Sequence, residues 1–387
     1  VKSVGNITRD SIKHPNKEGW VVSNKGKERS KITPFDNAGP EIEPTKESPG
    51  CRVLVTGGAG FLGQHLVSLL HTRVPDVHHI SVLDLQPFSN LLDYKPVKPV
   101  RCYQGCITNT ELLNEALAGV HTVYHIAGKI SFGTFPDLKG MHWVNVKGTN
   151  CVIEACLANN VSRLIFCSTV DVVIGYDDII NGCEASVTTP RHFLFPGYPE
   201  TKHLAEQEIL KANGARTQNE GDPYYVTSGL KNAQQAGGIL NQVGPGTARF
   251  QPVYVGNTAW AFTCADKALQ ENPNLGGQFY YVPDDTPVQN TFNFMKPFLE
   301  ARGHQLSTFK LPYNLVYYSL LFAEWIAWVI SPVYKISLPA ESYSVRYINM
   351  DLFFSRKKAE TELGFKPIFS PKKAIQMCLK YYRDLNL

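Results

Sequence analysis

The spacing of apolar residues changes abruptly at Cys51, where a polar stretch gives way to short apolar runs alternating with helical stretches. Five runs are predicted strands, and four stretches with apolar residues at i, i+3 and i+4 spacing are predicted helices. The strands are residues 52–56, 80–84, 100–104, 123–126 and 164–168, and the helices are residues 61–71, 109–118, 144–158 and 199–211. Alternation of this kind builds parallel sheets, so we predict an α/β fold with a doubly wound parallel sheet covered by helices on both faces.

The two ends of the chain differ from this pattern. Residues 1–50 are rich in Lys, Glu, Ser, Pro and Asn and have neither a 2.0 nor a 3.6 period, so we predict a disordered tail. The chain opens on Val1 without an apolar leader, which indicates either a fragment or an N-terminus without a secretory signal. We expect the sheet domain to cover residues 51–250 and a smaller substrate-binding region to cover residues 251–387.

Within the second region, residues 311–334 form an aromatic-rich apolar run that Glu324 interrupts. A membrane-spanning helix needs about 20 largely apolar residues. An acid at its centre costs about 2.5 to 3.5 kcal/mol. The run suits a helix packed on the core, an interfacial anchor with Tyr and Trp at headgroup level, or a true span. We favour association with a membrane.

Composition excludes some classes of function. The 387 residues are 43% hydrophobic and 19% charged, and the net charge of +4 comes from bases interspersed with acids. No concentrated basic surface is predicted, so we expect no nucleic-acid partner. The nine cysteines form no CxxC pair and several lie in apolar runs, which is typical of reduced core residues rather than a metal site.

A glycine-rich turn follows the first predicted strand and opens the first helix. Glycines in this context let backbone N–H groups and the helix N-terminus approach a pyrophosphate. Asp84 ends the second strand, where a carboxylate accepts hydrogen bonds from the adenosine ribose and repels a 2′-phosphate, so we predict a Rossmann-type site for NAD rather than NADP. The predicted cofactor residues are Gly57, Gly60, Phe61, Leu62, Gly63 and Asp84, joined by Tyr198 and Lys202.

Tyr198 and Lys202 form a candidate proton-transfer pair. A tyrosine has a reference pKa of about 10, so it needs a nearby cation to act as a base near neutral pH. Lys202 lies four residues on, on the same helical face. An exposed helix that happens to hold both residues is the alternative. A hydroxyl from the end of the preceding strand completes the set, and we favour Thr169 over Ser168.

These motifs carry a family resemblance. The glycine turn, Asp84, residues 144–149 and the Tyr198 motif together resemble the extended short-chain dehydrogenase/reductases. Residues 253–257, 277–287 and 358–367 are similar to the 3β-hydroxysteroid dehydrogenase/Δ5-Δ4 isomerases, and the resemblance covers roughly Cys51 to the C-terminus. It implies that Tyr198 is the acid/base, Lys202 lowers its pKa, Thr169 replaces the catalytic serine, and Asn145 supports the active-site water.

The resemblance also implies the chemistry. Tyr198 would remove the proton of a 3β-hydroxyl during hydride transfer to NAD, and the double bond would then move through a dienol. Asp284 and Asp285 are the implied proton carriers for that second step. The same Asp-Asp-Thr-Pro run is typical of a turn after a strand, and we favour the turn.

The chain departs from the family pattern in two places. Cys106 stands where the family has an acid that contacts adenine, so we expect weaker adenine binding. After the catalytic helix, the apolar strand with its Arg-Pro…Tyr-Gly signature is absent, and residues 213–222 lead straight into 223–228. We therefore predict that one sheet strand is missing, which would expose an edge beside the active site.

Several functions remain open. The first is NAD-dependent oxidation of a 3β-hydroxyl on a lipophilic steroid or sterol, with or without isomerisation. The rivals are a sterol-4α-carboxylate 3-dehydrogenase, a nucleotide-sugar epimerase, which the apolar run disfavours, and an inactive, cofactor-binding membrane scaffold. The resemblance implies the endoplasmic reticulum membrane with a cytoplasmic catalytic domain, or a mitochondrial membrane, and we regard a homodimer as an open option.

Overall fold

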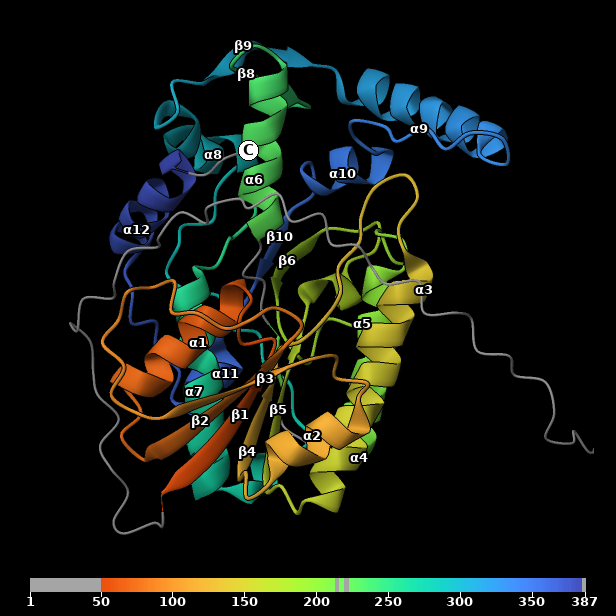
Figure 1. The fold of residues 1–387 in the computed structure, drawn as a ribbon. Coiled ribbons are helices and arrows are strands. Elements are labelled where there is room, and N and C mark those ends of the chain that lie inside the picture. The colour runs from red at the N-terminus through yellow and green to blue at the C-terminus, as the bar shows by residue number, and fades with distance from the viewer. Residues whose placement is uncertain (1–49, 213–215, 219–222, 385–387) are drawn as a thin grey trace, which may run out of the picture.

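The computed structural model of the chain describes residues 50–212, 216–218 and 223–384, so the expected tail lies almost wholly outside the described residues. Its centre is a parallel sheet with the strand order β3-β2-β1-β4-β5-β7 (Figure 1). The strands are β1 (Cys51–Thr56), β2 (Val77–Asp84), β3 (Val100–Gln104), β4 (Thr122–His125), β5 (Arg163–Ser168) and β7 (Arg216–Gln218). The five strands predicted from the apolar runs are confirmed, as is the doubly wound fold.

Helices cover both faces of this sheet because its central strands are apolar on both sides. In β1, Val53 and Val55 belong to the core beneath one helical layer, while Leu54 between them belongs to the core beneath the other. The first layer contains α1 (Phe61–Thr72), α7 (Val255–Glu271) and α11 (Lys357–Leu363), and the second contains α2 (Thr110–Leu117), α4 (Thr149–Ala158) and α5 (Tyr198–Lys211). The four predicted helices are present.

One predicted helix has an unexpected first part. Residues 144–158 were expected to form one α-helix, but the chain runs from α3 (Leu138–Met141) into a π-helix, η1 (His142–Gly148), before α4 begins. A π-helix widens one turn by a residue and is common at functional sites. It changes which side chains of this segment face the sheet.

The prediction of a missing strand needs correction. A short strand, β7, stands at the expected position and pairs in parallel with β5 through Phe166, Cys167 and Ser168. It has three residues, whereas β5 has six. The edge of the sheet beside the end of β5 is therefore covered, although the Arg-Pro…Tyr-Gly signature is absent from the sequence.

A second group of elements lies above the carboxyl ends of the strands (Figure 1). The chain returns from this group to the sheet domain through α7, which packs on α1 although it follows the expected boundary at residue 250. The group contains α6 (Pro223–Gln235), β8 (Ile239–Val243), α8 (Thr291–Glu300), β9 (Gln305–Leu311) and α12 (Pro371–Asp384), with β6 (Ile179–Gly182) and β10 (Leu352–Phe354) forming a small parallel sheet below. The short 3-10 helix η3 (Pro273–Leu275) follows α7 and packs on the core of the sheet domain.

The apolar run forms a single helix, α9 (Tyr313–Ile330), that projects along the top of the molecule over α10 (Ser342–Tyr347) (Figure 1). Among the described helices it is the one long and apolar enough to cross a membrane, and only 6% of it is buried. Glu324 turns inward, because its carboxylate accepts hydrogen bonds from the backbone N–H and the hydroxyl of Ser342 at the start of α10. The acid therefore ties α9 to the protein.

Candidate active site

The glycine turn between β1 and α1 is built for close approach by a ligand. Gly57 has a φ of +75°, and a side chain there would lie 2.8 Å from the backbone of Ala127. A side chain at Gly63 would lie 2.2 Å from the Gly57 carbonyl oxygen, so this glycine lets the helix pack on the turn. Gly60 is exposed and caps α1 without a side-chain hydrogen bond. The turn and the N-terminus of α1 therefore fit the pyrophosphate of a dinucleotide.

Asp84 lies beside this turn, as the sequence predicted for a ribose-binding acid. Its carboxylate accepts hydrogen bonds of 3.0 Å each from the backbone N–H groups of Ala59 and Gln86. Phe61 begins α1, while the Leu62 side chain is buried in the core, so Leu62 can offer a ligand only its backbone. These positions suit the adenosine half of a dinucleotide.

Tyr198 and Lys202 occupy the first turns of α5. Gly197 precedes them with a φ of +78°, where a side chain would meet Leu138 at 2.3 Å. Lys202 is buried, its ammonium donates a 2.6 Å hydrogen bond to the Cys167 carbonyl oxygen, and it lies 4.1 Å from the centre of the Phe166 ring. The Lys202 ammonium is thus held against the end of β5, while the residue itself belongs to α5, the helix that carries Tyr198.

Asn145 projects from the π-helix toward the same place. Its amide exchanges two hydrogen bonds with the backbone of Lys129, at 2.7 and 2.9 Å, and donates a third, at 3.0 Å, to the Thr201 hydroxyl. Thr201 is the residue before Lys202. Asn145 therefore joins the loop after β4 to α5, a position compatible with the implied support of active-site water.

The two hydroxyls at the end of β5 have different surroundings. Thr169 is buried, and its hydroxyl donates a 3.2 Å hydrogen bond to the carboxylate of Asp171. The same hydroxyl oxygen accepts a 3.2 Å hydrogen bond from the backbone N–H of Asp171. The Ser168 hydroxyl is buried and has no hydrogen-bond partner among the described residues. Thr169 opens a 3-10 helix, η2 (Val170–Val173), that lines the cavity described below. Neither Thr169 nor Ser168 itself lines the cavity, so the preference for Thr169 stays a prediction.

Two residues near this site were not singled out from the sequence. Asp171 is one, and the sequence signal was available, namely an acid two residues beyond Thr169. His125 is the other: fully buried at the end of β4, its ring bridges the hydroxyls of Thr56, at 2.7 Å, and Thr149, at 3.0 Å. Burial, helped by the charge of Lys202, lowers the pKa of His125 to about 3, so the ring is neutral. No local pattern predicts such a long-range bridge.

Asp284 and Asp285 lie between Pro283 and Thr286, two residues that line the cavity described below, but their own side chains have other partners. The Asp284 carboxylate is buried and accepts 2.9 Å hydrogen bonds from the backbone N–H groups of Tyr254 and Thr286 and from the amide of Asn257. Asp285 is about half exposed and pairs with Arg356 at 2.7 Å. Neither aspartate lines the cavity. This geometry favours the turn interpretation over a role in proton transfer.

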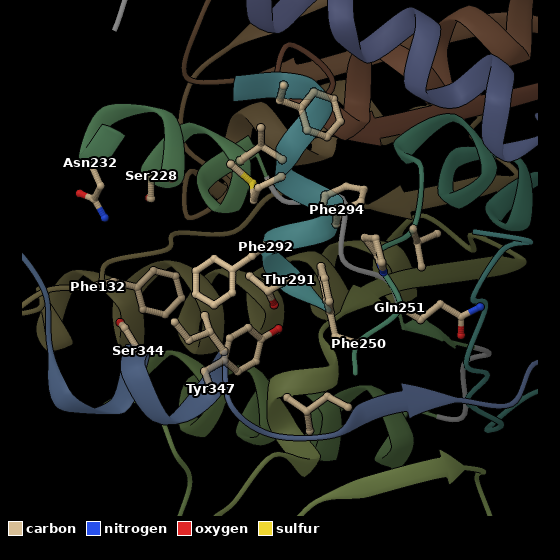
Figure 2. Close-up of a pocket in the computed structure, with 18 of the residues that line it drawn as sticks. Phe132, Ser228, Asn232, Phe250, Gln251, Thr291, Phe292, Phe294, Ser344 and Tyr347 are labelled. Carbon is tan, nitrogen blue, oxygen red and sulfur yellow. The ribbon is translucent and has the colours of Figure 1, made fainter. Parts of the chain in front are cut away.

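A large apolar cavity of about 820 Å³ lies between the sheet domain and the upper elements. Figure 2 shows the rings of Phe132, Phe292 and Tyr347 around one space, with Ser228 and Asn232 of α6 at its side. Phe61 of the glycine turn and Asp171 also line the cavity. Tyr198 is not a lining residue, but its ring contacts Phe132 at 5.7 Å between centroids. The cavity therefore extends to the immediate neighbours of the candidate catalytic residues.

A family model described as the 3-beta hydroxysteroid dehydrogenase/isomerase family matches residues 54–313. Three solved structures illustrate the similarity in fold. The dTDP-glucose 4,6-dehydratase of Bacillus anthracis, in complex with NAD, is 16% identical, with 86% of this chain and 96% of that chain covered and a TM-score of 0.61. DesIV of Streptomyces venezuelae, a dTDP-glucose 4,6-dehydratase with NAD and TYD bound, is 21% identical, with 86% and 97% covered and a TM-score of 0.60. The epimerase Mth375 of Methanothermobacter thermautotrophicus is 16% identical, with 86% and 92% covered and a TM-score of 0.62.

Proposed function

The chain belongs to the 3-beta hydroxysteroid dehydrogenase/isomerase family, as its motifs indicated, and from this premise we propose that it oxidises the 3β-hydroxyl of a steroid or sterol with NAD as the oxidant. The observation that carries the proposal is the position of the cavity. An apolar space of about 820 Å³ begins at Phe61 of the glycine turn and passes Asp171 beside the candidate catalytic hydroxyl. Ligand sites of 300 to 1,000 Å³ are typical of small molecules, and apolar walls suit a polycyclic lipid.

The residues that would hold the cofactor are those of the glycine turn together with Asp84. Gly57, Gly60 and Gly63 leave room for a pyrophosphate, and the Asp84 carboxylate disfavours a 2′-phosphate, which supports NAD over NADP. The NAD-bound dehydratases of similar fold add support. NAD bound there would accept the hydride from C3.

The chain's own residues would move the proton. Tyr198 is proposed to take the hydroxyl proton as C3 is oxidised, and the fixed cation of Lys202 stabilises the phenolate that this requires. The Thr169 hydroxyl would bond the reacting oxygen and hold it in place. Asn145 and neutral His125 hold the segments after β4 and at the end of β1 in place through their hydrogen bonds to Lys129 and Thr56.

We further propose that α9 holds the protein at a membrane surface. The outward face of the helix is apolar and exposed, whereas the acid Glu324 faces α10. A helix of 18 residues is about 27 Å long, slightly less than the hydrocarbon core of a bilayer. An interfacial position suits this length and the inward acid better than a span. The endoplasmic reticulum is the membrane that the family resemblance implies.

The test is a substrate panel with the purified, detergent-solubilised chain. We expect NADH to form with a 3β-hydroxy-5-ene steroid and not with a UDP- or dTDP-sugar. Release of carbon dioxide from a 4α-carboxysterol, with no turnover of the steroid, would instead indicate the sterol-4α-carboxylate 3-dehydrogenase. NAD binding without turnover of any of these substrates would overturn the proposal in favour of an inactive, cofactor-binding protein.

A further inference from the structure

Helix α9 forms part of the cavity wall on one side and is exposed on the other. Val316, Leu320 and Glu324 recur every four residues, so they lie along one stripe of the helix. The first two line the cavity, and the third bonds α10. Phe322 and Trp325 lie on the opposite side and are more than half exposed. The cavity therefore comes within one helix diameter, about 10 Å, of the proposed membrane surface.

Few contacts attach α9 to the rest of the protein. Of its 18 residues, Ala327 is the buried one, and none belongs to the hydrophobic clusters formed by the described residues. The carboxylate of Glu324 accepts hydrogen bonds from the backbone N–H and the hydroxyl of Ser342, the latter at 2.8 Å. An element that buries little apolar surface opens at a low free-energy cost. We call this pair of hydrogen bonds the α9 clamp.

The neighbouring helix α10 is anchored by contrast. Ser342 is buried at its start, and the rings of Tyr343 and Tyr347 contact the ring of Phe195, at 5.4 and 5.2 Å between centroids. Both tyrosines and Phe195 line the cavity. Phe195 lies three residues before Tyr198. A movement that widens the space between the two helices would therefore displace α9 and leave α10 beside the candidate catalytic residues.

The cavity has a second rim on α6. Ser228, Lys231 and Asn232 line the cavity there and are exposed, and Figure 2 shows Ser228 and Asn232 at its side. These side chains are polar, so the α6 rim suits water better than a lipid. Transfer of apolar surface from lipid into water is unfavourable in proportion to its area. A lipophilic steroid that passed beneath α9 would avoid this transfer, whereas one that passed the α6 rim would not.

We propose that the steroid enters the cavity from the membrane, through a passage that opens when α9 moves away from α10, and that the α9 clamp holds this passage closed. The inference rests on the proposed function, because it takes the substrate to be lipophilic and α9 to lie at a membrane surface. Glu324 is then a positioning residue for the wall of the cavity. Return of α9 would cover the bound steroid and exclude water during the oxidation.

The test measures how fast a naturally fluorescent 3β-hydroxysterol moves from phospholipid vesicles into the full chain. The vesicles carry a lipid-linked quencher, so fluorescence rises as the sterol leaves the bilayer. We expect Glu324→Ala, which removes the clamp, to speed uptake by ~10-fold, the worth of a hydrogen bond to a charged group. Ser342→Ala leaves the sequence of α9 unchanged and removes one of the two hydrogen bonds, so it should speed uptake by a smaller factor.

A covalent link gives the opposite test. In the double variant Glu324→Cys and Ser342→Cys, oxidation to a disulfide should slow uptake by at least ~10-fold, because α9 can no longer open. Reduction should return the rate to that of Glu324→Ala. The single cysteine variants and the wild type, treated with the same oxidant, should keep their untreated rates. Sedimentation with vesicles should be equal for all of these proteins, so that uptake reports the passage rather than membrane binding.

Two results would overturn the proposal. One is uptake that the disulfide leaves unchanged. The other is uptake that Asn232→Trp, at the α6 rim, slows and the disulfide does not, which would place the entrance on the side that faces water. Uptake needs no oxidation of the sterol, so the two proposals fail separately. Uptake that the disulfide blocks, in a chain that forms no NADH, would contradict the proposed dehydrogenase function and leave the passage standing.

Discussion

At the scale of single residues, Ser168 and Thr169 carry the same functional group at the end of β5 but differ in their hydrogen bonds. Ser168 and Thr169 both offer a buried hydroxyl, yet only that of Thr169 is joined to Asp171 at the cavity wall. A hydroxyl that bonds the reacting oxygen contributes most when charge develops there. The Ser168 hydroxyl has no hydrogen-bond partner among the described residues, so nothing links it to the cavity wall.

These two residues make a matched pair for mutation. We expect Thr169→Ala to lower kcat by about 10² to 10³, the loss found when one donor to a reacting oxygen is removed. Ser168→Ala should keep kcat within about twofold and raise the free energy of unfolding by up to about 1 kcal/mol, because it removes a buried hydroxyl without a partner. Steady-state kinetics and urea unfolding measure both. Equal losses of kcat would show that Thr169 has no special role.

The residues that sequence predicts well here are those whose role follows from a local pattern. The glycine turn, Asp84 and the Tyr198–Lys202 spacing each lie within one strand–turn or one helical turn, so they could be located before the structure was known. Asp171 stands two residues beyond Thr169 and could have been noted in the sequence, but its place at the cavity could not be predicted, nor could the bridge made by His125. These features depend on long-range contacts that the fold brings together.

At the scale of elements, α9 leaves most of its large apolar side chains exposed. Glu324 and Tyr317 are among its residues partly buried against the protein, whereas five large apolar residues are more than half exposed. They are Leu315 at 63% exposure, Tyr318 at 63%, Phe322 at 61%, Trp325 at 57% and Trp328 at 69%. A helix that faced only water would carry charges on that side. Trp and Tyr are the residues that favour the headgroup region of a bilayer.

This face can be tested with one exposed substitution and one control. We expect Trp325→Glu to weaken sedimentation of the chain with phospholipid vesicles by at least ~10-fold, because an acid is costly in the apolar part of the interface. Leu157→Glu introduces the same acid at a residue of α4 that is 69% exposed and should bind vesicles like the wild type. Equal vesicle binding by all three proteins would contradict an interfacial role for α9.

The elements show where periodicity succeeds and where it does not. Runs of apolar residues predicted the strands to within a few residues, most clearly for β1 and β4, which are buried on both faces of the sheet. The π-helix at His142–Gly148 could not be predicted from a 3.6-residue period, because its turns are wider than those of an α-helix. The strand β7 lies in a polar stretch with no apolar run, and its pairing with β5 comes from its place in the fold rather than from its own sequence.

At the scale of the whole molecule, one core joins the two expected regions. The cluster that contains Val53 and Leu66 also contains Phe262 of α7 and Phe365 near the C-terminus, so residues beyond 250 complete the first helical layer. Sequence alone could not show this, because the chain leaves the sheet for the upper elements before it returns. The cavity lies where these two groups of elements meet.

Two buried histidines, His65 and His125, stay neutral in the folded protein at mildly acidic pH, where they are protonated in the unfolded chain. Burial lowers the pKa of His65 to about 3, and burial with the charge of Lys202 does the same for His125. In the unfolded chain a histidine has a pKa near 6.5, so between pH 6.5 and 3 the unfolded state binds more protons and stability rises with pH. At pH 5 each histidine is expected to cost about 2 kcal/mol relative to pH 7.5.

His65→Phe should isolate one of these contributions. The ring of His65 makes edge contacts with Phe61 and Tyr254, at 5.5 and 6.0 Å, which phenylalanine can keep. Urea unfolding at pH 7.5 and 5 is expected to show a smaller difference in unfolding free energy for the variant than for the wild type, by about 2 kcal/mol. An unchanged difference would mean that His65 does not titrate on unfolding in this range.

The central claim is that Tyr198 moves the proton during oxidation of a 3β-hydroxyl, and the most direct measurement compares Tyr198→Phe with the wild type. Turnover of a 3β-hydroxy-5-ene steroid is followed as NADH, and the affinity for NAD is measured by titration. We expect turnover to fall by ~10² to 10⁴. We also expect NAD affinity to change by no more than about tenfold, the worth of one hydrogen bond. Turnover close to that of the wild type would contradict the account.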